Sequence, residues 1–180
     1  MFWVVEAHAD DAFLSLHDHM VGPWKDEELT IVTVFSSERR QREVQEYASR
    51  IGARSIWLGY PENKSMRSPC CVEPSLEDKL EEPFQQRDRL ILPVGIQHPE
   101  HLATAQMSES RRVWRYLDTP GYAKRKLADE VNGKIKNLRI VSLRKVHKSK
   151  WKHVELFKSQ SKFFYFNSPE KLPQVEIVLR

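Results

Sequence analysis

An almost unbroken run of apolar and β-branched residues, Leu29–Phe35 ("LTIVTVF"), constrains the fold most strongly. Such a run is typical of a strand whose two faces are both buried, as in a parallel sheet covered by helices. A helical pattern follows it directly: Ser37 can cap this helix, apolar residues lie along one side, and Gly52 ends it. The run therefore predicts a layered fold of strands and helices.

The rest of the chain continues this alternation between short β-branched runs and longer helical patterns. Because strands that alternate with helices usually form a parallel sheet, we predict an α/β fold with a mainly parallel central sheet. At 180 residues the chain is most simply one domain, spanning residues 1–180. Further strands are predicted at residues 2–7, 55–58, 89–94, 112–117 and 138–143, and further helices at residues 11–20 and 149–160.

Titratable side chains follow two of the predicted strands. His8, Asp10 and Asp11 come directly after the first strand, and His98 and His101 follow the strand at residues 89–94. Ligands of layered α/β folds gather at the carboxyl ends of the strands, so the two clusters could meet at one rim of the sheet. Buried carboxylates need a partner, which a cation or solvent could supply. The alternative interpretation is a helix cap, with one of the aspartates accepting backbone N–H groups.

Taken together, the two clusters favour metal chemistry over helix capping. A histidine and a carboxylate from one strand end, with a histidine from another, make a mixed nitrogen and oxygen ligand set. Such a set suits a catalytic zinc that keeps three protein ligands and one open position. A second carboxylate and a second histidine remain to act as base and acid.

The same residues resemble the motifs of a known family, the PIG-L/LmbE-like N-deacetylases. "AHADDA" resembles the family's A/P-H-P-D-D-E motif, and "HPEH" resembles its H-P-D-H motif. Between them, "SERRQREVQEYASRIGARSIWLGYPE" resembles the R-x-x-E…A…LG…LG-x-P-D segment, and "KHVELFKSQ" resembles the later K-x-x-A…H-x-SQ helix. The four matches occur in the right order and span most of the chain, which makes them more specific than any one motif.

The resemblance implies a Rossmann-like fold and zinc-dependent hydrolysis of an N-acetyl group on an N-acetylglucosamine-type sugar or glycoside. It implies that His8, Asp11 and His101 hold the zinc. Asp10 would be the general base that takes a proton from the attacking water, and His98 would stabilise the oxyanion and protonate the leaving amine. The implied cofactor is Zn²⁺, with another divalent metal such as Fe²⁺ as the alternative, and the implied partner is a small N-acetylated sugar.

The sequence also departs from the family's motifs. Ala9 replaces a proline, which changes the rigidity of the loop, and Ala12 replaces an acidic residue, so the support from that carboxylate is missing. Glu100 replaces an aspartate and keeps its charge. Arg40, three residues before Glu43, matches the position of a substrate-binding arginine.

Positive charge is unevenly spread along the chain. The formal net charge is +4, and residues 134–162 contain many lysines and arginines but a single acid, Glu155. This stretch is either a solvated basic face or a surface that meets phosphate groups, and in the second case the substrate would be anionic. The alternative function is therefore a non-catalytic phosphate- or nucleic-acid-binding protein on the same fold, although no RNA-binding or helix-turn-helix pattern accompanies the charge.

The remaining polar residues indicate the compartment rather than the chemistry. Cys70 and Cys71 are adjacent and make a poor structural disulfide, which agrees with a reducing compartment. No apolar run approaches the length of a bilayer span, and no signal peptide pattern precedes the first strand, so we expect a cytoplasmic protein. His17 and His19 are two residues apart and cannot share one helical face, so we expect them at the surface.

Overall fold

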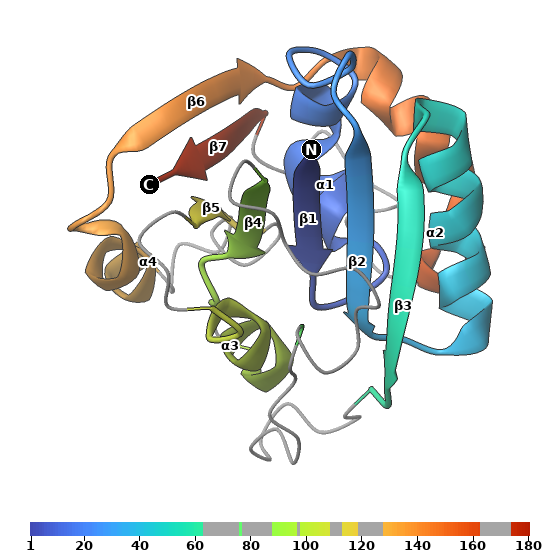
Figure 1. Cartoon of the computed structure of the whole chain (residues 1–180), viewed down its shortest axis with the longest axis horizontal. Helices are drawn as coiled ribbons and strands as arrows, with labels where there is room; N and C mark the ends of the chain where they lie inside the picture. Colours follow the sequence, from blue (N-terminus) through green and yellow to red (C-terminus); the bar gives the residue numbers. More distant parts are fainter. Residues whose placement is uncertain (63–75, 77–87, 97, 109–112, 119–127, 163–173) are drawn as a thin grey trace.

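A seven-stranded sheet forms the centre of the computed structural model, which describes residues 1–62, 76, 88–96, 98–108, 113–118, 128–162 and 174–180 (Figure 1). The strand order is β3-β2-β1-β4-β5-β7-β6. The strands are β1 (Phe2–Glu6), β2 (Leu29–Phe35), β3 (Arg54–Tyr60), β4 (Arg89–Pro93), β5 (Trp114–Tyr116), β6 (Ile140–Lys145) and β7 (Val175–Leu179).

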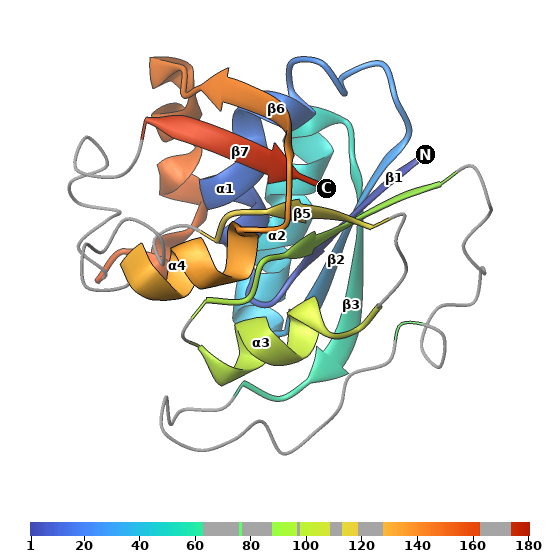
Figure 2. The same ribbon diagram turned by 90° about the vertical axis from the view of Figure 1, so that its left-hand side faces the viewer.

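The first five strands run parallel, as the sequence predicts. Only β7 breaks the pattern, because it is antiparallel to both β5 and β6. Figure 2 brings this edge to the front, where the arrows of β6 and β7 point in opposite directions. The predicted α/β class and mainly parallel sheet are confirmed.

Helices cover the sheet and lie at one end of it. They are α1 (Asp11–Met20), α2 (Glu38–Ile51), α3 (Pro99–Ala105) and α4 (Ala128–Ile135), with 3₁₀ segments η3 (Lys148–Leu156) and η4 (Lys158–Gln160). The helix predicted at residues 149–160 is thus wound as two tighter segments, whose backbone bonds run from residue i to i−3. No helix in the described ranges is long and apolar enough to cross a membrane. Cys70 and Cys71 lie outside the described residues.

The two faces of the sheet carry separate hydrophobic clusters because successive side chains of a strand point in opposite directions. Val4 and Ile31 face α1, α2 and η3, in a cluster that includes Phe13 and Tyr47. Val5 and Val32 face the other way, towards partly buried side chains that include Ala103 of α3. Every residue of β2 is buried, as expected for a strand covered on both faces.

The predicted ends of α2 are confirmed. Ser37 is its N-cap residue, although its side chain makes no capping hydrogen bond, and Gly52 ends the helix with φ 74°. This left-handed backbone conformation favours glycine, because a Cβ is disfavoured there.

The prediction that His17 and His19 lie at the surface is wrong. Both side chains are buried, as is every residue of α1, and each imidazole contacts polar side chains from other elements. His17 Nδ1 lies 2.7 Å from the Tyr47 hydroxyl. His19 lies 3.0 Å from Glu176 through Nδ1 and 3.0 Å from Ser142 through Nε2. These partners replace water and allow polar rings inside the fold.

The basic stretch at residues 134–162 is not one continuous solvated face. Lys150 is buried, and its ammonium group donates to the carbonyl of Leu14 at 2.7 Å and to Glu176 at 2.9 Å. The carboxylate of Glu176 also accepts the backbone N–H groups of Asp18 and His19. Through this buried ion pair, η3 and β7 both make hydrogen bonds to the backbone of α1.

Candidate metal and catalytic site

Two tight turns bring the predicted clusters to one end of the sheet (Figure 1). After β1, the carbonyl of His8 accepts the N–H groups of Asp10 and Asp11, and α1 begins at once. After β4, Gly95 adopts φ 80°, and a Cβ there would lie 2.7 Å from the side chain of Ala105. Glycine thus permits the close approach of α3, whose N-cap residue is His98.

Three ligand atoms from these turns form a small triangle. His8 Nδ1 lies 3.0 Å from His101 Nε2 and 3.6 Å from Asp11 Oδ2, and His101 Nε2 lies 3.3 Å from Asp11 Oδ2. Two ligands of a tetrahedral zinc, each about 2.0–2.1 Å from the metal, stand roughly 3.3 Å apart. The spacing and the two-nitrogen, one-oxygen chemistry of this group therefore fit the zinc ligands that the sequence predicts.

A buried carboxylate supports each histidine of the triangle. Glu100 lies 2.5 Å from His8 Nε2, and Asp118 lies 2.9 Å from His101 Nδ1. Each carboxylate can accept the ring proton of its histidine, which leaves the other ring nitrogen as a lone-pair donor facing the triangle. Paired carboxylate and histidine groups of this kind are the usual surroundings of a metal ligand.

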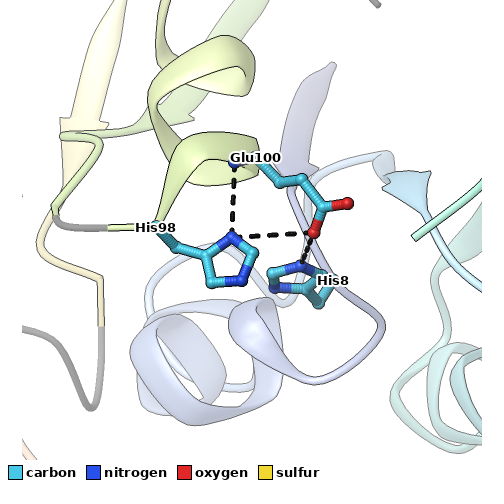
Figure 3. A group of neighbouring side chains, drawn as sticks. All are labelled: His8, His98 and Glu100. Carbon is cyan, nitrogen blue, oxygen red and sulfur yellow. Dashed lines mark hydrogen bonds and ion pairs between the residues drawn. The ribbon is translucent and has the colours of Figure 1, made fainter. Parts of the chain in front are cut away.

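A second group of potential ligands consists of His8, His98 and Glu100 (Figure 3). Figure 3 shows one carboxylate oxygen of Glu100 joined by dashed lines to a nitrogen of each ring. Its contact with His8, at 2.5 Å, is a hydrogen bond and is too short for two ligands of one zinc ion. This group therefore supports the first triangle rather than competing with it.

His98 stands beside the triangle and has a defined neutral tautomer. Its Nδ1 accepts the backbone N–H of Glu100 at 3.3 Å, so the ring proton of the neutral form lies on Nε2. Burial lowers the pKa of His98 to about 4, and the charge of His101 adds to the effect. Near neutral pH the imidazole of His98 is therefore a hydrogen-bond donor through Nε2.

Asp10 and Asp11 are adjacent in sequence but face different partners. Asp10 Oδ1 accepts a hydrogen bond from Arg40 at 2.6 Å, whereas Asp11 lies in the triangle and accepts the N–H of His8 at 2.8 Å. Asp10 makes no side-chain capping bond to α1. Asp10 therefore does not cap α1 through its side chain. The geometry brings Arg40 to the site, where its substrate-binding role stays a prediction.

Two acidic side chains, Asp11 and Asp118, contact His101. Burial raises the pKa of Asp11 to about 7, although the charge of His101 opposes the shift. Burial alone would lower the pKa of His101, but the carboxylates of Asp11 and Asp118 outweigh it and raise this pKa to about 9. Metal binding at His101 would therefore release one of its two ring protons, and the cation would take over the balancing of these carboxylates.

Sequence reasoning missed Asp118 and Glu6. Asp118 is buried, and besides His101 it receives the N–H groups of Val94, Gly95 and Ile96. Its position directly after the strand predicted at residues 112–117 was the signal that could have found it.

Glu6 ends β1 and is buried beneath the turn that follows. Its carboxyl group accepts the backbone N–H of Ala12 at 2.9 Å and the hydroxyl of Thr33 at 2.7 Å. The carboxyl group of Glu6 thus contacts the backbone of Ala12, whose own side chain has no carboxyl group. Nothing in an apolar strand pattern distinguishes such a residue from an ordinary strand end.

No family model and no curated protein matches the sequence. Solved structures do match the fold over nearly the whole chain. The pseudoaglycone deacetylase Dbv21 shares 18% identity and a TM-score of 0.58, over 99% of this chain and 95% of that chain. The zinc-inhibited form of the teicoplanin deacetylase Orf2 shares 13% identity and a TM-score of 0.59, over 99% and 96%.

A triple mutant of a deacetylase from the teicoplanin biosynthetic pathway is similar in the same way. It shares 14% identity and a TM-score of 0.60, over 98% of this chain and 97% of that chain. At such low identity the likeness concerns the fold. The chain has the fold of known deacetylases.

Proposed function

We propose that this protein is a metal-dependent N-deacetylase with a Rossmann-like fold, which removes the acetyl group from an N-acetylglucosamine-type sugar or glycoside. The observation that carries the proposal is the triangle of His8, Asp11 and His101, whose ligand atoms lie 3.0–3.6 Å apart. The deacetylase neighbours and the motif resemblance support the same reaction class.

His8, Asp11 and His101 would hold the metal, with Zn²⁺ as the best match to the donor set. A divalent cation there would supply Lewis-acid polarisation of an amide carbonyl and would lower the pKa of water to about 7. Glu100 and Asp118 would orient the two imidazoles, since each lies within 3.0 Å of a ring nitrogen.

Asp10 and His98 would perform the proton transfers. Asp10 lies beside the triangle, and its carboxylate would take a proton from the attacking water. His98 would donate its Nε2 proton in a hydrogen bond to the developing oxyanion. Because the pKa of His98 is about 4, it would have to receive a proton before it could protonate the leaving amine.

Metal analysis of purified variants tests where the cation binds. We expect about one Zn²⁺ per wild-type chain, and much less in Asp11→Asn and His101→Ala, because each change removes one of three protein ligands. His98→Ala serves as the control and should retain the metal. Equal metal content in all four proteins, or none in the wild type, would contradict the proposed ligand set.

A further inference from the structure

Arg40 and Glu43 of α2 contact two consecutive residues of η4, Ser159 and Gln160, which lie far away in the sequence. Glu43 accepts the backbone N–H of Ser159 at 2.8 Å and its hydroxyl at 2.5 Å. With its amide oxygen turned towards the guanidinium, buried Gln160 accepts from Arg40 Nε at 2.5 Å and Nη2 at 3.2 Å. We call these four residues the α2–η4 clasp. Figure 1 shows the segment that contains η3 and η4 beside α2.

The clasp completes the set of partners around the Arg40 guanidinium. Nη1 donates to Glu62 at 2.8 Å, and Nη2 donates to Asp10 at 2.6 Å. Gln160 occupies the Nε edge. A guanidinium is a planar fork with fixed donor directions, so partners on three sides define its orientation.

We propose that the α2–η4 clasp positions Asp10 through Arg40, an inference that rests on the proposed role of Asp10 as the general base. Arg40 and Glu43 are positioning residues in this scheme, and Arg40 acts on the carboxylate of Asp10 rather than on the substrate alone. A charge-assisted hydrogen bond of 2.6 Å to one carboxylate oxygen restricts the rotation of the Asp10 side chain. Proton transfer in turn requires Asp10 to stay within hydrogen-bond reach of the water it deprotonates.

Glu43 matters in this scheme because η4 has little structure of its own. It is a three-residue 3₁₀ segment, so its place depends on contacts with the rest of the fold. Glu43 supplies two hydrogen bonds to Ser159 and so fixes the residue that precedes Gln160. Without Glu43, we expect Gln160 to move away from Arg40, and Arg40 to lose its defined orientation.

Matched alanine variants on α2 provide the kinetic test. Glu43→Ala should lower kcat for acetate release from an N-acetylglucosamine glycoside roughly 10- to 100-fold, the scale of a small misplacement of a catalytic group. Zinc content should stay unchanged, and the fall in kcat should be larger than any rise in KM. Glu43→Gln keeps an oxygen for the Ser159 N–H and should retain most of the wild-type kcat. Glu46→Ala is the control, since Glu46 lies on the same helix in an exposed pair with Arg50. Equal kcat values for Glu43→Ala and Glu46→Ala would overturn the inference.

A crystal structure of Glu43→Ala separates this inference from the proposed function, and Ser159→Ala replaces it should that variant fail to fold. We expect Arg40 to leave both Gln160 and Asp10. If Arg40 keeps its contact with Asp10, the inference is wrong whether or not the protein hydrolyses amides. If Arg40 moves as expected but wild-type protein releases no acetate, the inference that the clasp positions Asp10 stands and the proposed function fails.

Discussion

At the scale of single residues, the site is defined by carboxylates that face different ways. Asp11 joins His8 and His101, whereas Asp10 turns to Arg40, although the two aspartates are neighbours in the chain. The sequence allowed both a cap and a metal site, and the side-chain directions support the metal-site prediction because Asp10 makes no side-chain capping bond. Adjacent residues after a strand leave the backbone in different directions, so one metal ligand and one base can occupy consecutive positions.

Asp10→Asn should therefore keep both fold and metal but lose turnover. An amide cannot accept the proton of the attacking water, and loss of a general base typically costs about 10²–10⁴-fold in rate. Asp11→Asn should instead weaken metal retention, and added Zn²⁺ should partly restore its activity. Zinc content and acetate release measured on both variants check this assignment. Loss of zinc from Asp10→Asn with retention in Asp11→Asn would reverse the two roles.

Asp118 provides a second test at this scale. Asp118→Asn keeps the size of the side chain but removes the charge that holds the Nδ1 proton of His101. Changes of this kind typically reduce metal affinity about 10- to 100-fold. Titration of metal-stripped protein with Zn²⁺ measures the effect, and Asp129→Asn, on α4, is a control outside the ion pairs of the site. Identical zinc affinities for Asp118→Asn and the control would show that Asp118 acts only as an acceptor of backbone N–H groups and does not support metal binding.

At the scale of elements, α1 depends on partners that local sequence patterns do not reveal. Its bounds follow from the sequence, and so do those of α2, because apolar spacing and the glycine that ends α2 are local signals. The burial of His17 and His19 does not follow, since their partners Tyr47 and Glu176 come from distant segments. The same holds for Lys150, whose buried contacts are with Leu14 and Glu176.

Glu176 should make the stability of the wild-type protein depend on pH in a defined window, and Glu176→Gln should remove this dependence. Burial alone would raise the pKa of Glu176, but Lys150 and hydrogen bonds outweigh it and lower the pKa to about 2. Because the folded-state pKa lies below the ordinary value of 4.5, the carboxylate stabilises the fold above about pH 4.5. This contribution is lost as the pH falls towards 2.

Urea unfolding measures the effect. At pH 7 we expect Glu176→Gln to lose roughly 3–5 kcal/mol, because the change leaves Lys150 buried without its anion. The difference from wild type should shrink as the pH falls from 4.5 to 3. Glu155→Gln, which alters an exposed pair with Arg50, should differ from wild type by less than about 1 kcal/mol. A Glu176→Gln deficit that is small at pH 7 would contradict the role of the buried pair.

At the scale of the whole molecule, the parallel sheet explains why residues far apart in sequence meet. β1 and β4 are neighbours in the sheet, so the turns that follow them lie together at one end. The sequence predicted this meeting of His8 with His101 from strand direction alone. It could not predict Asp118 as the partner of His101, because β5 is short and its place beside β4 depends on the assembled sheet.

Metal binding should stabilise the whole fold, because the triangle joins the turns after two different strands. A ligand at 100 times its Kd stabilises a folded protein by about 2.7 kcal/mol, which corresponds to a rise in Tm of roughly 5–10 °C for a domain of this size. Calorimetry of metal-stripped protein, with and without Zn²⁺, measures this shift. His101→Ala should show a much smaller rise, and an equal rise would place the stabilising cation elsewhere.

The central claim is that a cation held by His8, Asp11 and His101 makes this protein an amide hydrolase. It is tested most directly by measuring acetate released from a panel of N-acetylglucosamine glycosides while Zn²⁺ is added back to metal-stripped protein. We expect no release without metal and a rise that saturates near one Zn²⁺ per chain. Acetate release that is independent of metal, or its absence across the panel from protein that has bound one Zn²⁺ per chain, would contradict the claim.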